Sequence, residues 1–132
     1  MSAIYAFYSS RLAEISNESL RCDLKKIFRF NHSIDFSIQV LPFVKSKELH
    51  LLWDKKWGVG FSIDEPPLAI ENYYFLNSSS NINVDIDRQL KISFGVDFNR
   101  EYTNEVIFIL EYIEKINGVV IFDSNKKLLY KS

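Results

Sequence analysis

The sequence predicts an α+β fold, a single two-layer domain in which a largely antiparallel sheet carries two helices on one face. Several segments alternate apolar and polar residues, as half-buried strands do, most clearly from Leu90 to Phe98. Two segments, one near each end of the chain, have apolar residues at helical spacing. The strand segments are grouped between those two helices. Half-polar strands of this kind indicate that helices cover one face of the sheet and that the other face meets solvent or a partner.

The first half of the chain begins with a strand and a helix. Residues 4–8 are apolar at successive positions, which is typical of a strand in the middle of a sheet. Ser16 or Asn17 can cap a helix that ends near Asn31. Alternation then predicts three strands, and a turn at residues 54–57 joins the last two. These strands cover residues 34–40, 48–53 and 59–63.

The second half is predicted to contain further strands before the last helix. The Pro66-Pro67 pair breaks the sheet or moves the chain to an edge. Ala69–Leu76 is a candidate strand, and the alternation of Ile82, Val84 and Ile86 predicts another. A short polar loop, Ser78–Asn81, separates these two segments.

The C-terminal part is predicted to be a helix, a glycine stop and a β-hairpin. Thr103 is a good N-cap for a helix that runs to Ile116. Gly118 stands where a left-handed C-terminal residue is expected. Residues 119–122 and 128–130 then form the two strands of the hairpin.

Composition limits the class of protein. The chain has 132 residues, which fits one domain over residues 1–132. A net charge of -1 argues against non-specific nucleic-acid binding. Cys22 is the only cysteine, which favours a reducing compartment. The N-terminal residues do not form a signal peptide, and no apolar run reaches the roughly 20 residues that a membrane span needs. We therefore expect a cytoplasmic protein without a membrane partner.

No motif in the sequence specifies a chemistry. His32 and His50 lack a cysteine or carboxylate at ligand spacing, so both are interpreted as surface residues and no metal is expected. Asn83, Asp85 and Asp87 would share one strand face, but the glycine and distal glutamate of a calcium loop are missing. Cys22 has no histidine nearby and is interpreted as a buried or half-buried structural thiol. The sequence indicates no cofactor and no enzyme.

Charge and aromatic residues point to a binding surface in the second half of the chain. Residues 64–114 contain ten acidic and three basic residues, whereas residues 21–56 contain eight basic and four acidic ones. An acidic patch can steer a basic partner, although the same residues can be ordinary solvated surface. Aromatic side chains near carboxylates are common at interface hot spots. The candidate partner-binding residues are Trp57, Glu71, Tyr73, Tyr74, Asp85 and Asp87. Packing in the core is the alternative role for Trp53 and Trp57.

The C-terminal third has a recognisable pattern. A strand at Leu90–Phe94 precedes a helix over Val106–Ile116, and a strand pair at Gly118–Asp123 and Leu128–Lys131 follows. This pattern resembles small bacterial immunity proteins that neutralise polymorphic or contact-dependent toxins. The resemblance implies a non-enzymatic cytoplasmic protein that binds one toxin and blocks its active site or an adjacent surface. It carries no site residue over to this chain.

We therefore expect a binding protein that neutralises a cognate protein toxin, such as a basic nuclease. The main alternative is a small cytoplasmic enzyme or ligand-binding domain whose cleft is assembled from distant residues. A third alternative is a homodimer or structural subunit that associates through an edge strand at Ala69–Leu76.

Overall fold

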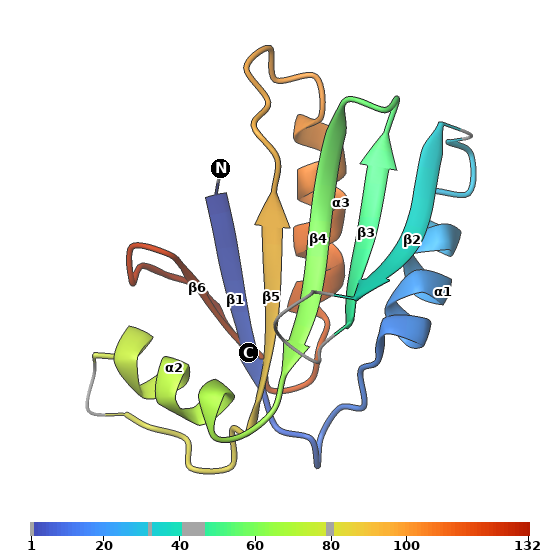
Figure 1. The fold of residues 1–132 in the computed structure, drawn as a ribbon. Coiled ribbons are helices and arrows are strands. Elements are labelled where there is room, and N and C mark those ends of the chain that lie inside the picture. Colours follow the sequence, from blue (N-terminus) through green and yellow to red (C-terminus); the bar gives the residue numbers. More distant parts are fainter. Residues whose placement is uncertain (1, 32, 41–46, 79–80) are drawn as a thin grey trace.

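The computed structural model describes residues 2–31, 33–40, 47–78 and 81–132. Over these residues the chain forms a sheet of seven strands and three helices (Figure 1). In chain order the elements are β1 (Ser2–Tyr8), α1 (Asn17–Ile27), β2 (Ile34–Val40), β3 (Lys47–Trp53), β4 (Trp57–Asp64), α2 (Leu68–Leu76), β5 (Arg88–Phe94), α3 (Thr103–Glu114), β6 (Val120–Asp123) and β7 (Leu128–Lys131). The predicted α+β class with an antiparallel sheet is confirmed.

The strands lie in the order β2-β3-β4-β5-β1-β6-β7, and every neighbouring pair is antiparallel. The apolar first strand, β1, is in mid-sheet between β5 and β6, as its sequence predicts. Asp54 and Lys55 have φ values of 54° and 56°, the left-handed geometry of a tight hairpin turn between β3 and β4. Within the described sheet, β2 and β7 are the edge strands.

Helices α1 and α3 cover the first face of the sheet. Leu20 and Leu24 of α1, and Ile109 and Ile113 of α3, belong to one buried cluster with inward-facing residues of β1, β3, β4 and β5. Figure 1 shows both helices behind the sheet. The two helices predicted to pack on one face therefore do so.

Four aromatic rings form the centre of this first-face core. Trp53 contacts Phe28 edge-on at 5.3 Å, and Trp57 stacks on Tyr102 with ring centroids 4.7 Å apart. The Trp57 indole N–H donates to the Gly95 carbonyl at 2.9 Å. Rings in these arrangements contribute dispersion and quadrupole attraction beyond simple burial.

Helix α2 covers one end of the opposite face. Tyr73 and Leu76 of α2 pack in a second buried cluster with Phe7 of β1 and with Val120 and Phe122 of β6. Because successive strand residues point to opposite faces, Phe7 lies on the other side of the sheet from its neighbours in the first cluster. Figure 1 shows α2 at the lower left, beside the lower end of β1.

Three predicted strand segments are wrong or too long. Ala69–Leu76 lies within helix α2 and is not an edge strand. The segment around Val84 is a turn and carries no strand, so residues 83, 85 and 87 do not share a strand face. Strand β5 ends at Phe94, and Val96 and Phe98 lie beyond it with exposed side chains.

The start of α1 follows the expected chemistry, whereas the predicted cap and end of α3 are wrong, since Thr103 is not its cap and the helix ends at Glu114 instead of Ile116. Ser16 caps α1, where its hydroxyl accepts from the Ser19 N–H and the Ser19 hydroxyl accepts from the Ser16 N–H. Helix α3 begins at Thr103, with Tyr102 at the cap position instead of Thr103. Gly118 has a φ of 75°, the left-handed geometry predicted for it. None of the helices in the described ranges is long and apolar enough to cross a membrane.

Candidate functional surface

The structure separates the six predicted partner-binding residues into two groups. Trp57 and Tyr73 are 2% and 1% exposed and belong to the two cores, so their burial removes them from the candidate surface. Glu71, Tyr74 and Asp85 are exposed, and Asp87 is half-buried. As the sequence indicated, one of the adjacent tyrosines, Tyr74, is exposed.

Helix α2 presents an unusual amount of apolar side chain to solvent. Leu68, Tyr74 and Phe75 are 47%, 51% and 65% exposed, and Glu71 lies among them on the solvent side of the helix. The Lys126 ammonium, from the β6–β7 turn, lies 4.1 Å from the centroid of the Phe75 ring. We call these four helix residues, Leu68, Glu71, Tyr74 and Phe75, the α2 surface.

Partly buried polar contacts hold α2 to the following loop and to the sheet. The Tyr73 hydroxyl accepts from the Asn83 N–H at 3.0 Å, which ties the helix to the segment that follows it. The Asn72 amide donates to Gln89 of β5 at 2.8 Å, and Gln89 donates to Asp64 of β4 at 2.6 Å. Burial raises the pKa of the Asp64 carboxyl, although the Gln89 amide and the Lys91 charge oppose this effect. The α2 surface is therefore held on a fixed support.

The segment that carries this surface is strongly acidic. Residues 64–87 contain five carboxylates and no lysine or arginine. Asp85 is exposed, and its backbone N–H donates to the side chain of Asn83 in a local turn. Carboxylates around exposed aromatic rings favour contact with a basic surface.

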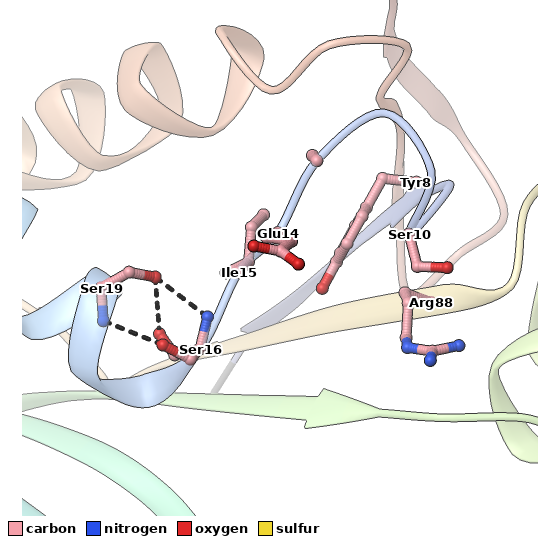
Figure 2. Close-up of a pocket in the computed structure, with 8 residues that line it drawn as sticks. Tyr8, Ser10, Glu14, Ile15, Ser16, Ser19 and Arg88 are labelled. Atoms are coloured by element: carbon pink, nitrogen blue, oxygen red, sulfur yellow. Dashed lines mark hydrogen bonds between the residues drawn. The ribbon is translucent and has the colours of Figure 1, made fainter.

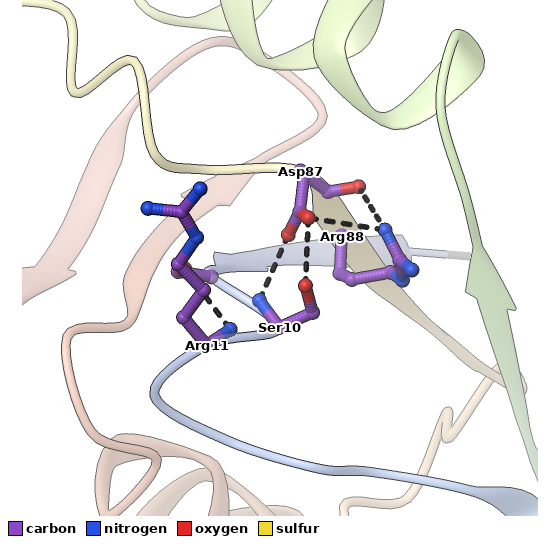
Figure 3. Close-up of polar contacts among 5 residues, drawn as sticks. Ser10, Arg11, Asp87 and Arg88 are labelled. Carbon is purple, nitrogen blue, oxygen red and sulfur yellow. Dashed lines mark hydrogen bonds and ion pairs between the residues drawn. The ribbon is translucent and has the colours of Figure 1, made fainter.

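Asp87 has a structural role at the end of this segment (Figure 3). Its carboxylate accepts from the Ser10 N–H at 2.8 Å and from the Ser10 hydroxyl at 2.7 Å, and pairs with Arg88 at 3.3 Å. Burial alone would raise the pKa of Asp87, but the Ser10 hydrogen bonds and the Arg88 charge outweigh it and hold the pKa below 3.8. Asp87 thus joins the β1–α1 connection to the start of β5.

A cleft of about 440 Å³ lies beside this network, at the β1–α1 connection (Figure 2). Tyr8, Ser10, Glu14, Ser19 and Arg88 are among its lining residues. Tyr8 is 1% exposed, and its hydroxyl points into the cleft (Figure 2). Burial raises the pKa of Tyr8 to about 12, so the phenol stays protonated and can donate a hydrogen bond.

The remaining reactive side chains have ordinary surroundings. His50 lies on the face of β3 opposite the first core, as predicted, and its Nε2 pairs with Glu48 at 2.7 Å. Cys22 is exposed on α1, so the prediction of a buried or half-buried thiol is wrong. His32 and the middle of the predicted polar loop lie outside the described residues. Among the described residues, no group of three or more metal-ligating side chains comes together.

Sequence reasoning missed Leu68 and Phe75 because it interpreted their segment as a strand. Two signals were available. Proline is common at the first positions of a helix, so Pro66-Pro67 can also mark a helix start. Ala69, Tyr73 and Leu76 are spaced four and three residues apart, which is the buried side of one helix face.

No protein-family model matches the chain, and neither the curated proteins nor the solved structures that were compared with it contain a match.

Proposed function

We propose that this chain is a non-enzymatic, cytoplasmic immunity protein that binds a cognate protein toxin and occludes its active site or an adjacent surface. The observation that carries this proposal is the α2 surface: exposed aromatic and aliphatic side chains on a rigidly supported helix, within a segment that has carboxylates and no basic residue. The resemblance of the C-terminal strand, helix and hairpin to immunity proteins is in accord with it.

The surface suggests a division of roles. Tyr74 and Phe75 would be the anchors, since large exposed rings next to each other supply most of the binding energy at small interfaces. Glu71 and Asp85 would steer a basic partner, such as a nuclease whose own substrate is anionic. Asp87 is set apart, because its hydrogen bonds to Ser10 serve the fold.

The experiment that tests this function is a native pull-down from the source organism with the tagged chain as bait, followed by mass spectrometry. The proposal expects a stoichiometric protein that is toxic when expressed alone and tolerated when this chain is co-expressed. A bait that recovers no stoichiometric partner would contradict the proposal.

A matched pair of variants tests the surface. Tyr74→Ala with Phe75→Ala should abolish capture and protection, because both rings are exposed and their removal leaves the core intact. Phe98→Ala is the control, since Phe98 is 91% exposed but lies in the connection between β5 and α3, at the other end of the sheet. If the Phe98→Ala control lost capture and protection to the same extent, the α2 surface would not be the binding interface.

The cleft beside Asp87 favours a second candidate function, binding of a small polar molecule. The hydroxyl of Tyr8, the carboxylate of Glu14 and the guanidinium of Arg88 would provide donors and an acceptor for a hydroxyl-rich ligand. A thermal-shift screen of sugars and polyols tests it. A hit with this chain that is lost in Tyr8→Phe would support the candidate, and a screen without hits would contradict it.

A further inference from the structure

The Phe75 ring of the α2 surface is in contact with a cation of the chain itself. The Lys126 ammonium lies 4.1 Å from the centroid of this ring, which is close enough for cation–π attraction. Phe75 is 65% exposed, so the ring is open to solvent around the lysine. Because residues 64–87 contain no lysine or arginine, this cation is brought to the α2 surface from the β6–β7 turn.

The turn that carries Lys126 is fixed by Asp123, at the end of β6. The Asp123 carboxylate accepts from the N–H groups of Asn125 at 2.8 Å and Lys127 at 2.9 Å. Its carbonyl accepts from the Lys126 N–H at 3.2 Å. Lys126 has a φ of 65°, a left-handed conformation that glycine and asparagine adopt more readily than lysine. These contacts hold the backbone from which the ammonium reaches Phe75.

Glu71 lies beside the same ring. Glu71 and Phe75 are four residues apart in α2, so they are neighbours on one side of the helix. Glu71 is exposed, and none of the ion pairs within the described residues includes it. Lys126 therefore contacts the ring and makes no ion pair with the neighbouring carboxylate.

An arginine side chain can use both groups at once. Its planar guanidinium stacks on an aromatic face and donates two parallel hydrogen bonds to a carboxylate. We propose that an arginine of the partner binds across Phe75 and Glu71 and displaces Lys126 from the ring. This inference rests on the proposed function, in which the α2 surface meets a basic partner. Lys126 then lowers the affinity for any basic partner that contacts the ring without also pairing with Glu71.

Titration with a hexa-arginine peptide at low ionic strength tests this site without a toxin. Calorimetry gives the dissociation constants, and NMR chemical shifts locate the peptide. Lys126→Asn removes the ammonium and suits the left-handed turn, so it should bind the peptide about two- to five-fold more tightly than wild type. Lys127→Asn is the matched control, because it removes the same charge from the same turn and Lys126 is the lysine over the ring. It should change the affinity by less.

Substitutions in the site complete the test. Phe75→Leu, added to Lys126→Asn, should cancel the gain in affinity, and Glu71→Gln should weaken binding of the peptide. Both side chains are exposed, so the variants should keep the fold, as checked by circular dichroism. The proposal would be overturned if Lys126→Asn bound the peptide no more tightly than Lys127→Asn, or if the shifts lay outside residues 68–76 and 123–127. These affinities do not depend on a toxin, so failure of this inference is distinguishable from a pull-down that contradicts the immunity function.

Discussion

The two faces of the sheet are packed in different ways. On the first face, α1 and α3 bury a continuous core with Trp53, Trp57 and Tyr102 at its centre. On the second face, α2 packs against one end of β1, β5 and β6, and no other helix of the described residues lies on that face. The first face therefore contains most of the buried core, and the second face carries the exposed α2 surface.

One row of residues across the uncovered part of the second face is polar or glycine. The strand register places Ser37, His50, Gly60 and Ser93 in one row across β2, β3, β4 and β5. A Cβ atom at residue 60 would meet the Glu48 carboxylate, which is the flexible end of a side chain and would have to move aside. A flat polar row of this kind has little apolar area to bury, so it needs no helix above it.

The largest loss of stability is expected from a substitution in the core of the first face. Trp57→Ala removes a buried indole that stacks on Tyr102 and donates to Gly95, and should lower the free energy of unfolding by about 3–5 kcal/mol. Denaturant titration measures it. Phe98→Ala should change this free energy by less than about 0.5 kcal/mol, because Phe98 is exposed. A loss below about 1 kcal/mol for Trp57→Ala would show that the aromatic centre does not dominate the first face.

A smaller loss of stability, confined to α2 and the loop after it, is expected from a change on the second face. Tyr73→Phe keeps the buried ring but leaves the Asn83 N–H without its acceptor, which should cost about 1 kcal/mol. Hydrogen exchange should become faster in α2 and in residues 81–87, while the amides of β3 and β4 keep their protection. Uniformly faster exchange over both faces would contradict the view that α2 is an independently held unit.

The sequence predicted the first face well because its signals are regular and local. Ser16 begins α1, and alternation fixes which residues of β3, β4 and β5 point inward. A helix cap and strand alternation both depend on residues that are close together in the sequence. For these elements no tertiary information was needed.

The second face and the candidate surface could not be predicted in the same way. Eight mostly apolar residues, 69–76, fit a buried strand as well as a short helix, and only the fold decides between them. The alternation of Ile82, Val84 and Ile86 is lost because residues 84 and 85 form a turn, after which Ile86 packs under α2. Asp87 was selected as a candidate residue because of its charge. Its hydrogen bonds to Ser10 could not be predicted, because the fold brings together two residues that are 77 positions apart.

The smallest expected effect concerns the connection between the two faces at Asp87. The pKa of Asp87 in the folded chain lies below 3.8, so its contribution to stability is complete above this pH and is lost as the pH falls through the folded pKa.

Asp87→Asn should lower the free energy of unfolding at neutral pH by about 1 kcal/mol or less, since the Arg88–Asp87 pair is partly solvent-exposed. The difference from wild type should shrink as the pH falls below the ordinary pKa of an aspartate. Asp85→Asn is the matched control, because Asp85 is exposed and its neighbour contact uses only the backbone N–H. Chemical denaturation at several pH values measures both. If the Asp87→Asn difference were constant down to the lowest pH, the carboxylate charge would have no part in joining the β1–α1 connection to β5, and the Ser10 hydrogen bonds alone would make that contact.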